Sequence, residues 1–81
     1  MSIRVALVDD HSLIRMSLSH LLADVPGIDM IWQANSGEDA LLRVRAESPD
    51  VLLMDLDMPG MGGHEAALRL LKTAPGVRIV M

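Results

Sequence analysis

Residues 5–15, VALVDDHSLIR, pass from four apolar residues to two adjacent aspartates and a histidine. The apolar run 3–8 is short, nearly continuous and half β-branched, which is typical of a strand buried on both faces of a sheet. From Ser12 onward the apolar residues recur at helical spacing instead. The stretch therefore predicts a buried strand followed directly by a helix, with two like charges at the junction.

The helix predicted after this junction has one apolar side. Ser12 is a suitable N-cap, and Pro26-Gly27 is expected to end the helix. The apolar positions recur at intervals of three and four residues and are expected to face the core. They are Ile14, Leu18, Leu21, Leu22 and Val25.

Strand and helix periods alternate along the rest of the sequence. Further strands are predicted over 28–34, 50–55 and 77–81, with helices over 36–48 and 64–73 between them. This order predicts an α/β fold, a doubly wound parallel sheet with helices on both faces and right-handed crossovers. In such sheets ligands bind at the carboxyl ends of the strands, where the strand order reverses.

The starts and faces of the two later helices can also be predicted. Ser36 is followed three residues later by Asp39, which resembles a capping box. A loop is predicted over 56–63, because its Pro and Gly residues interrupt both regular periods. The inward-facing residues of the last helix are expected to be Ala67, Leu68 and Leu71.

Composition limits the possible classes of protein. The chain has 81 residues, no cysteine and a net charge of −4, and its seven basic residues are scattered. Disulfides and thiolate metal sites are thereby excluded, and direct nucleic-acid binding by this segment is not expected. No apolar run reaches the ~18 residues that a membrane span needs, so a cytoplasmic location is expected. The 51% hydrophobic content predicts either thorough burial or an apolar surface for a partner.

Three aspartates follow predicted strands. Asp9 and Asp10 come after the first strand, and Asp55 ends the third. If these strands are neighbours, each pair of carboxylates repels by about 4 kcal/mol at ~4 Å and an effective dielectric near 20. A cation or a proton must relieve this repulsion. Oxygen ligands without a thiolate favour Mg²⁺, which leaves room for a phosphate oxygen.

Each of these features also has a plainer interpretation. Asp9 and Asp10 taken alone are typical of helix capping, and Asp55 taken alone is typical of a strand end. His11 adjoins the cluster and could ligate a metal, although a histidine at a helix start is more often a solvated first-turn residue. The joint placement of the three aspartates favours a functional site.

Two stretches carry a resemblance to a known family. ALVDDH at 6–11 and DVLLMDLDMPGMGGHEA at 50–66 resemble the receiver domain of bacterial two-component response regulators. The most similar branch is the NarL/FixJ type, which has a LuxR-type helix-turn-helix output domain. The resemblance covers the whole sequence and implies a flavodoxin-like, CheY-like fold with strand order 2-1-3-4.

The resemblance also implies roles for individual residues. Asp55 would be the phosphoacceptor, and Asp10 and Asp55 would ligate Mg²⁺ directly. Asp9 would act on the ion through a water, and Asp57 would give its backbone carbonyl. The loop behind the site would be shaped by Pro59 and Gly60.

The implied biology is signal relay. The phosphoryl group would come from a phosphohistidine on a sensor histidine kinase or a phosphotransfer protein. The domain would not be an enzyme in the usual sense, with at most self-catalysed phosphotransfer and dephosphorylation. In the intact protein it would control transcription through the output domain.

The family pattern extends beyond residue 81. It includes a fourth helix, a fifth strand, a fifth helix and the DNA-binding domain. It also includes a switch serine or threonine just beyond residue 81 and a lysine at the end of the fifth strand, which contacts the phosphoryl group in the family. Residues 1–81 are therefore interpreted as the N-terminal part of a receiver domain. We expect impaired phosphotransfer, loss of relay, and self-association through the exposed strand 77–81.

Two alternatives remain open from the residues alone. MDLDMPG at 54–60 contains the Asp-x-Asp of haloacid-dehalogenase-like phosphatases, with Asp55 as nucleophile and Asp57 as acid. The second alternative is a fragment that only dimerises or that inhibits a longer relative.

Overall fold

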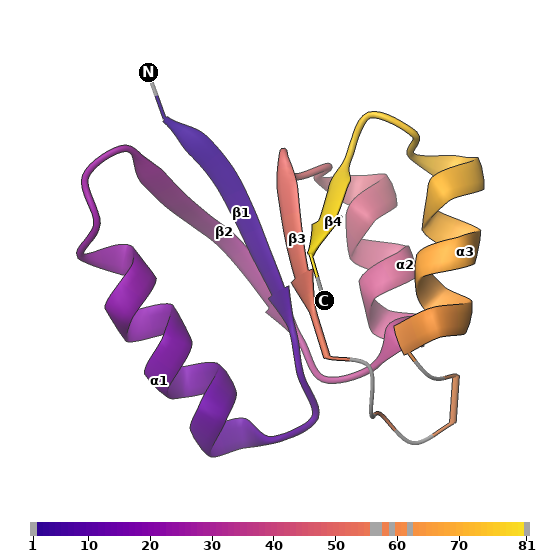
Figure 1. The fold of residues 1–81 in the computed structure, drawn as a ribbon, viewed down its shortest axis with the longest axis horizontal. Coiled ribbons are helices and arrows are strands. Elements are labelled where there is room, and N and C mark those ends of the chain that lie inside the picture. Colours follow the sequence, from indigo (N-terminus) through magenta and orange to yellow (C-terminus); the bar gives the residue numbers. More distant parts are fainter. Residues whose placement is uncertain (1, 56–57, 59, 62, 81) are drawn as a thin grey trace.

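Four strands form one sheet that carries helices on both faces (Figure 1). The computed structural model describes residues 2–55, 58, 60–61 and 63–80. In chain order the elements are β1 (Ile3–Val8), α1 (Ser12–Ala23), β2 (Ile28–Ala34), α2 (Gly37–Ala46), β3 (Val51–Met54), α3 (Gly63–Thr73) and β4 (Arg78–Val80). The α/β alternation predicted from the sequence is confirmed.

The sheet has the order β2-β1-β3-β4, and its pairs are parallel. The predicted order 2-1-3-4 is therefore confirmed. Val8, the last residue of β1, stands opposite Ala34 of β2 on one side and Met54 of β3 on the other. In the sheet, β2 lies on one side of β1, whereas β3 and β4 lie on the other side. The carboxyl end of β1 is therefore the point where the strand order reverses, which is where such sheets bind ligands.

β1 is buried on both faces, as its apolar run predicted. Its last four residues, Val5 to Val8, are all at most 5% exposed. α1 lies on one face of the sheet, and α2 and α3 lie on the other (Figure 1). Most of the core lies between the sheet and the α2–α3 layer, where Ala6, Val8 and Leu52 are completely buried.

α1 differs from the prediction at its start and along its apolar side. The N-cap residue is His11 rather than Ser12, and no side chain caps the helix. The expected core positions are substantially exposed, 47% for Ile14 and 68% for Leu21. The buried helical residue is Ser19, whose hydroxyl donates to the carbonyl of Arg15. α1 packs mainly on β2 and β1, so the sheet covers only part of its apolar stripe.

α2 begins as predicted, whereas α3 faces the core through different residues. The backbone N–H of Asp39 donates to the Ser36 hydroxyl at 3.1 Å, which confirms the cap. In α3, Ala67 is buried as expected, but Leu68 and Leu71 are exposed. Small residues bring α2 and α3 close together, and for this reason the alanine side of α3 turns inward. Its buried residues are Ala66, Ala67 and Leu70.

The last two strands are shorter than predicted. β3 covers Val51–Met54 instead of 50–55, and β4 covers Arg78–Val80 instead of 77–81. Val77 is buried just before β4, while residue 81 lies outside the described part of the chain. Within the described residues, no helix has both the length and the apolar character needed to cross a membrane.

Candidate functional site

The sheet register brings the strand-end aspartates to one edge. The backbone N–H of Asp9 donates to the carbonyl of Ala34, and that of Asp55 donates to the carbonyl of Val8. Both aspartates therefore stand one residue beyond the paired strands, at the same level of the sheet. Asp10 follows at the turn into α1, and the structure places all three aspartates in one cluster, as the sequence predicted.

The carboxylates of the cluster are partly accessible to solvent. Asp9 is buried, whereas the side chains of Asp10 and Asp55 are 27% and 28% exposed. Together with His11, each residue offers one ligand atom, and these four atoms lie within 4.8 Å of one another. A small ion can therefore reach the carboxylates from solvent.

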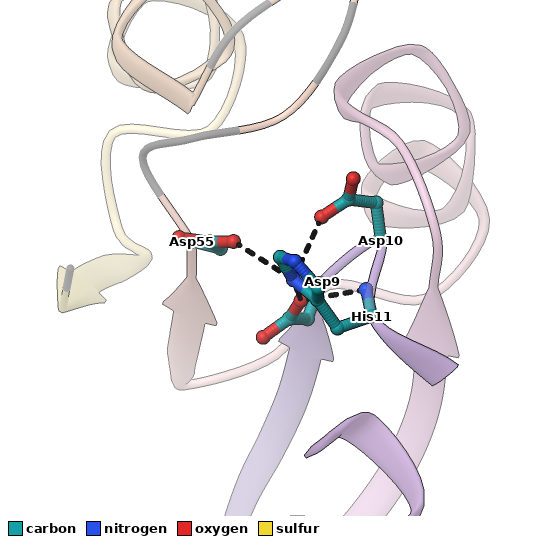
Figure 2. A group of neighbouring side chains, drawn as sticks. All are labelled: Asp9, Asp10, His11 and Asp55. Atoms are coloured by element: carbon teal, nitrogen blue, oxygen red, sulfur yellow. Dashed lines mark hydrogen bonds and ion pairs between the residues drawn. The ribbon is translucent and has the colours of Figure 1, made fainter. Parts of the chain in front are cut away.

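His11 joins the three carboxylates (Figure 2). Its backbone N–H donates to Oδ1 of Asp9 at 2.8 Å, and its ring Nδ1 lies 2.9 Å from the same oxygen. Nδ1 is also 3.1 Å from Oδ1 of Asp10 and 3.6 Å from Oδ2 of Asp55. From the sequence alone, His11 is expected to be a solvated first-turn residue. Its position directly after the acidic pair was the signal for this contact.

The carboxylates change the acid–base behaviour of the imidazole. The hydrogen bond with Asp9, followed by the negative charge of Asp10, raises the pKa of His11 above 6.5. Desolvation of the ring acts in the opposite direction, and the charges of Asp9 and Asp55 add smaller increases to the pKa. The cluster thus has a field that favours positive charge.

Arg15 holds the backbone at the site. Its Nη1 donates to the carbonyl of Asp9 at 2.7 Å, from one turn into α1. This bond ties the end of β1 to the helix and leaves the Asp9 carboxylate pointing into the cluster (Figure 2). The sequence does not reveal this role of Arg15, because no local spacing rule links it to Asp9.

One oxygen in the cluster fits a metal ligand. Oδ1 of Asp10 is buried and has no hydrogen-bond partner among the described residues. Such an oxygen is costly unless a cation or water binds it. With neighbouring carboxylate oxygens and no sulfur, the donor set suits a small, hard divalent cation.

The loop after β3 is described only in part. Asp57 and Pro59, both predicted to contribute to the site, lie outside the described residues. Gly60 has a φ of +72°, which a residue with a side chain rarely adopts. A Cβ at this position would lie 3.4 Å from Oε2 of Glu38.

The sequence matches the family described as Response regulator receiver domain over residues 5–81. The chain belongs to this family. It is 47% identical over 78 residues to the response regulator GacA of Pseudomonas viridiflava, covering 96% of this chain and 36% of GacA. The chain thus spans little more than a third of the relative's length.

Solved receiver structures share the fold. The response regulator domain of Thermotoga maritima CheB matches with a TM-score of 0.94 and 33% identity, covering 100% of this chain and 60% of that one. A LuxR-family two-component response regulator from Aurantimonas sp. SI85-9A1 matches with a TM-score of 0.91 and 33% identity. The match covers 98% of this chain and 56% of that one. The family membership gives no support to the phosphatase alternative. Receiver domains bind Mg²⁺ at an acidic pocket and interact with histidine kinases or phosphotransfer proteins.

Proposed function

We propose that Asp55 accepts a phosphoryl group from a phosphohistidine of a sensor histidine kinase or phosphotransfer protein. The observation that supports this role is the position of Asp55 at the carboxyl end of β3, beside Asp9 and Asp10 at the point of strand-order reversal. Its side chain is partly exposed, so a partner's phosphohistidine can approach it.

The transfer is a simple displacement at phosphorus. A carboxylate oxygen of Asp55 forms the new P–O bond while the P–N bond to the donor imidazole breaks, and that imidazole leaves with the electron pair and takes up a proton. Both reactants are anionic, so positioning and charge neutralisation supply most of the catalysis. The domain is therefore consumed as an acceptor, and we propose no enzymatic turnover beyond self-catalysed transfer and hydrolysis.

The acidic cluster would hold the ion needed for this displacement. Asp10 and Asp55 would ligate Mg²⁺ directly, and Asp9 would act through a water. Asp57, which lies outside the described residues, would add its backbone carbonyl. Bound Mg²⁺ neutralises and orients the transferring phosphoryl oxygens.

In the longer protein we propose that phosphorylation controls transcription in the cytoplasm. The acyl phosphate adds about −1.5 to −2 charges at one place, which can bias a two-state element. The similarity to a response regulator described as LuxR family supports an output domain of the LuxR type. Residues 1–81 would then form the first part of the receiver domain.

We also propose that the isolated chain self-associates. β4 lies at the edge of the sheet, and Val80 in it is 51% exposed. An unprotected apolar edge strand can pair with another chain.

Phosphoryl labelling tests the acceptor directly. The chain would be incubated with Mg²⁺ and acetyl phosphate or phosphoramidate, and its intact mass followed over time. We expect slow addition of one phosphoryl group, mapped to Asp55 by peptide analysis. Asp55→Asn and chelation of Mg²⁺ should each abolish the label, whereas Asp29→Asn, a remote exposed carboxylate, should leave it unchanged. Labelling at another residue, or no labelling at all, would contradict the proposal.

Thermal unfolding tests the metal site independently of phosphotransfer. A ligand that binds only the folded state at 100 times its Kd stabilises it by about 2.7 kcal/mol. Millimolar Mg²⁺ should therefore raise the Tm of the wild type and of Asp29→Asn, and Asp10→Asn should weaken the response. An equal response in Asp10→Asn would remove this residue from the ligand set.

A further inference from the structure

The ring of His11 faces the carboxylate cluster and offers it one nitrogen ligand atom (Figure 2). Its Nδ1 lies 2.9, 3.1 and 3.6 Å from one oxygen each of Asp9, Asp10 and Asp55. The His11 side chain is 57% exposed. It therefore contacts the cluster from the solvent side, without being forced there by burial.

These distances resemble the spacing of ligands around one ion. In octahedral coordination with bonds of about 2.1 Å, adjacent ligand atoms stand about 3 Å apart. The separation from Nδ1 to Oδ1 of Asp10 is close to that value, and the separation to Oδ2 of Asp55 is somewhat longer. Oδ1 of Asp9, which would act on the ion through a water, lies 2.9 Å from Nδ1. Nδ1 thus occupies a position that a ligand would take beside carboxylate ligands.

A hydrogen bond between His11 and Asp9 accounts for only part of the arrangement. Nδ1 carries at most one hydrogen, which can be donated to Oδ1 of Asp9 at 2.9 Å. Oδ1 of Asp10 remains buried without a hydrogen-bond partner among the described residues, although Nδ1 is only 3.1 Å away. With the ring hydrogen on Nε2 instead, Nδ1 offers a lone pair, and a cation between them would bind both this nitrogen and the Asp10 oxygen.

We propose that Nδ1 of His11 is a direct metal ligand and that it makes the site favour Mn²⁺ over Mg²⁺. The inference rests on the metal site of the proposed function. Imidazole is a good ligand for transition ions, whereas Mg²⁺ takes oxygen ligands and keeps its waters. Mn²⁺ accepts both the carboxylates and the nitrogen, and one coordination position would still be left for a phosphoryl oxygen.

Pulsed electron paramagnetic resonance on the Mn²⁺-loaded chain, free of any histidine tag, tests this assignment. We expect the spin-echo modulation of a directly coordinated ¹⁴N in the wild type. The signal should be lost in His11→Ala and His11→Gln but retained in His64→Ala, which removes an exposed histidine at the start of α3. No side-chain capping bond is lost with the His11 ring, so the variants should fold, as circular dichroism would verify.

Calorimetric titration with each metal alone gives a second measurement. Loss of an outer-shell partner commonly weakens metal binding 10–100-fold, so loss of a direct ligand should weaken Mn²⁺ binding at least about tenfold. Mg²⁺ binding should change much less, so the preference for Mn²⁺ should decrease. Binding of both ions with no ¹⁴N coupling would overturn the role of His11 while leaving the proposed site intact. Failure of the wild type to bind either ion would overturn both.

Discussion

At the scale of single residues, His11 is the side chain whose observed role differs most from the role expected from the sequence. It is the N-cap residue of α1, yet its ring does not cap the helix and instead faces the carboxylates of Asp9, Asp10 and Asp55. In the absence of a metal ion, a protonated His11 is the cation that reduces repulsion within the cluster. The raised pKa of His11 follows from this position.

The pKa of His11 predicts how stability depends on pH in metal-free protein. Because the pKa is raised above 6.5 in the folded state, protonation of His11 favours folding. This contribution is fully present below the unfolded pKa and is lost as pH rises through the folded pKa. Relative to His11→Gln, the wild type should therefore be more stable at pH 6 than at pH 9, as measured by urea unfolding.

His64→Gln is the matched control for this pH dependence. His64 is exposed on α3 and does not belong to the acidic cluster, so its replacement removes a histidine without changing the contacts of the carboxylates. A constant difference between the wild type and His11→Gln from pH 6 to pH 9 would show that the ring contributes nothing through its charge.

At the scale of elements, the contact between α2 and α3 depends on small residues. A Cβ added at Gly37 would lie 2.9 Å from Cβ of Ala66 and 3.0 Å from the carbonyl oxygen of Met61. Gly37 is the first residue of α2, and Ala66 is completely buried in α3. The close approach of the two helices explains why α3 turns Ala66 and Leu70 inward and leaves Leu68 exposed.

Gly37→Ala should destabilise the fold. Overpacking typically costs about 1–3 kcal/mol, while the better helix propensity of alanine returns at most about 1 kcal/mol. We expect a net loss of roughly 1–2 kcal/mol in the free energy of unfolding. Adding Ala66→Gly should recover part of this loss by removing the opposing methyl group, a coupling that a double-mutant cycle would measure.

Gly76→Ala is the control for the Gly37 substitution. No atom lies within 4 Å of a Cβ at Gly76, and its φ is outside the left-handed range. Its effect should remain within about 0.5 kcal/mol. Equal effects at the two glycines would mean that the α2–α3 contact is not tight in solution.

At the scale of the whole molecule, one face of the sheet is only partly covered. A hollow of about 270 Å³ lies between α1 and the β3–β4 side of the sheet, beside Asp9 and Asp55 of the acidic cluster. Its walls are mostly apolar and include Leu7, Leu18 and Val80. The high hydrophobic content noted in the sequence is therefore not fully buried in the isolated chain.

The proposed self-association follows from this open face and the β4 edge. We expect the sedimentation coefficient of the wild type to rise with concentration. Val80→Lys places a charge on the edge strand and should shift the chain toward monomer. Leu68→Lys replaces an exposed leucine of α3, 61% exposed compared with 51% for Val80, and should leave association unchanged. A wild type that stays monomeric at high concentration would end the proposal.

The sequence by itself determined the order of elements, the parallel sheet and the identity of the acidic cluster. These features depend on local periodicity: β1 and β2 begin and end at the predicted residues, and Ser36 caps α2 as expected. The three aspartates could be placed together because carboxyl ends of parallel strands share one edge of the sheet. Residue spacing was sufficient for the elements and the parallel sheet, whereas the resemblance to receiver domains supplied the strand order that makes β1 and β3 neighbours.

Only the tertiary structure decided which side chains face which neighbours. The α1 stripe has a helical period, but the period does not reveal that the sheet leaves Ile14 and Leu21 exposed. The inward side of α3 was set by the close approach of Gly37 and Ala66, which lie in different elements. His11 and Arg15 likewise gained their roles from the position of the cluster relative to α1. Local spacing fixes a repeat, whereas contacts between distant residues require the packed arrangement of the elements.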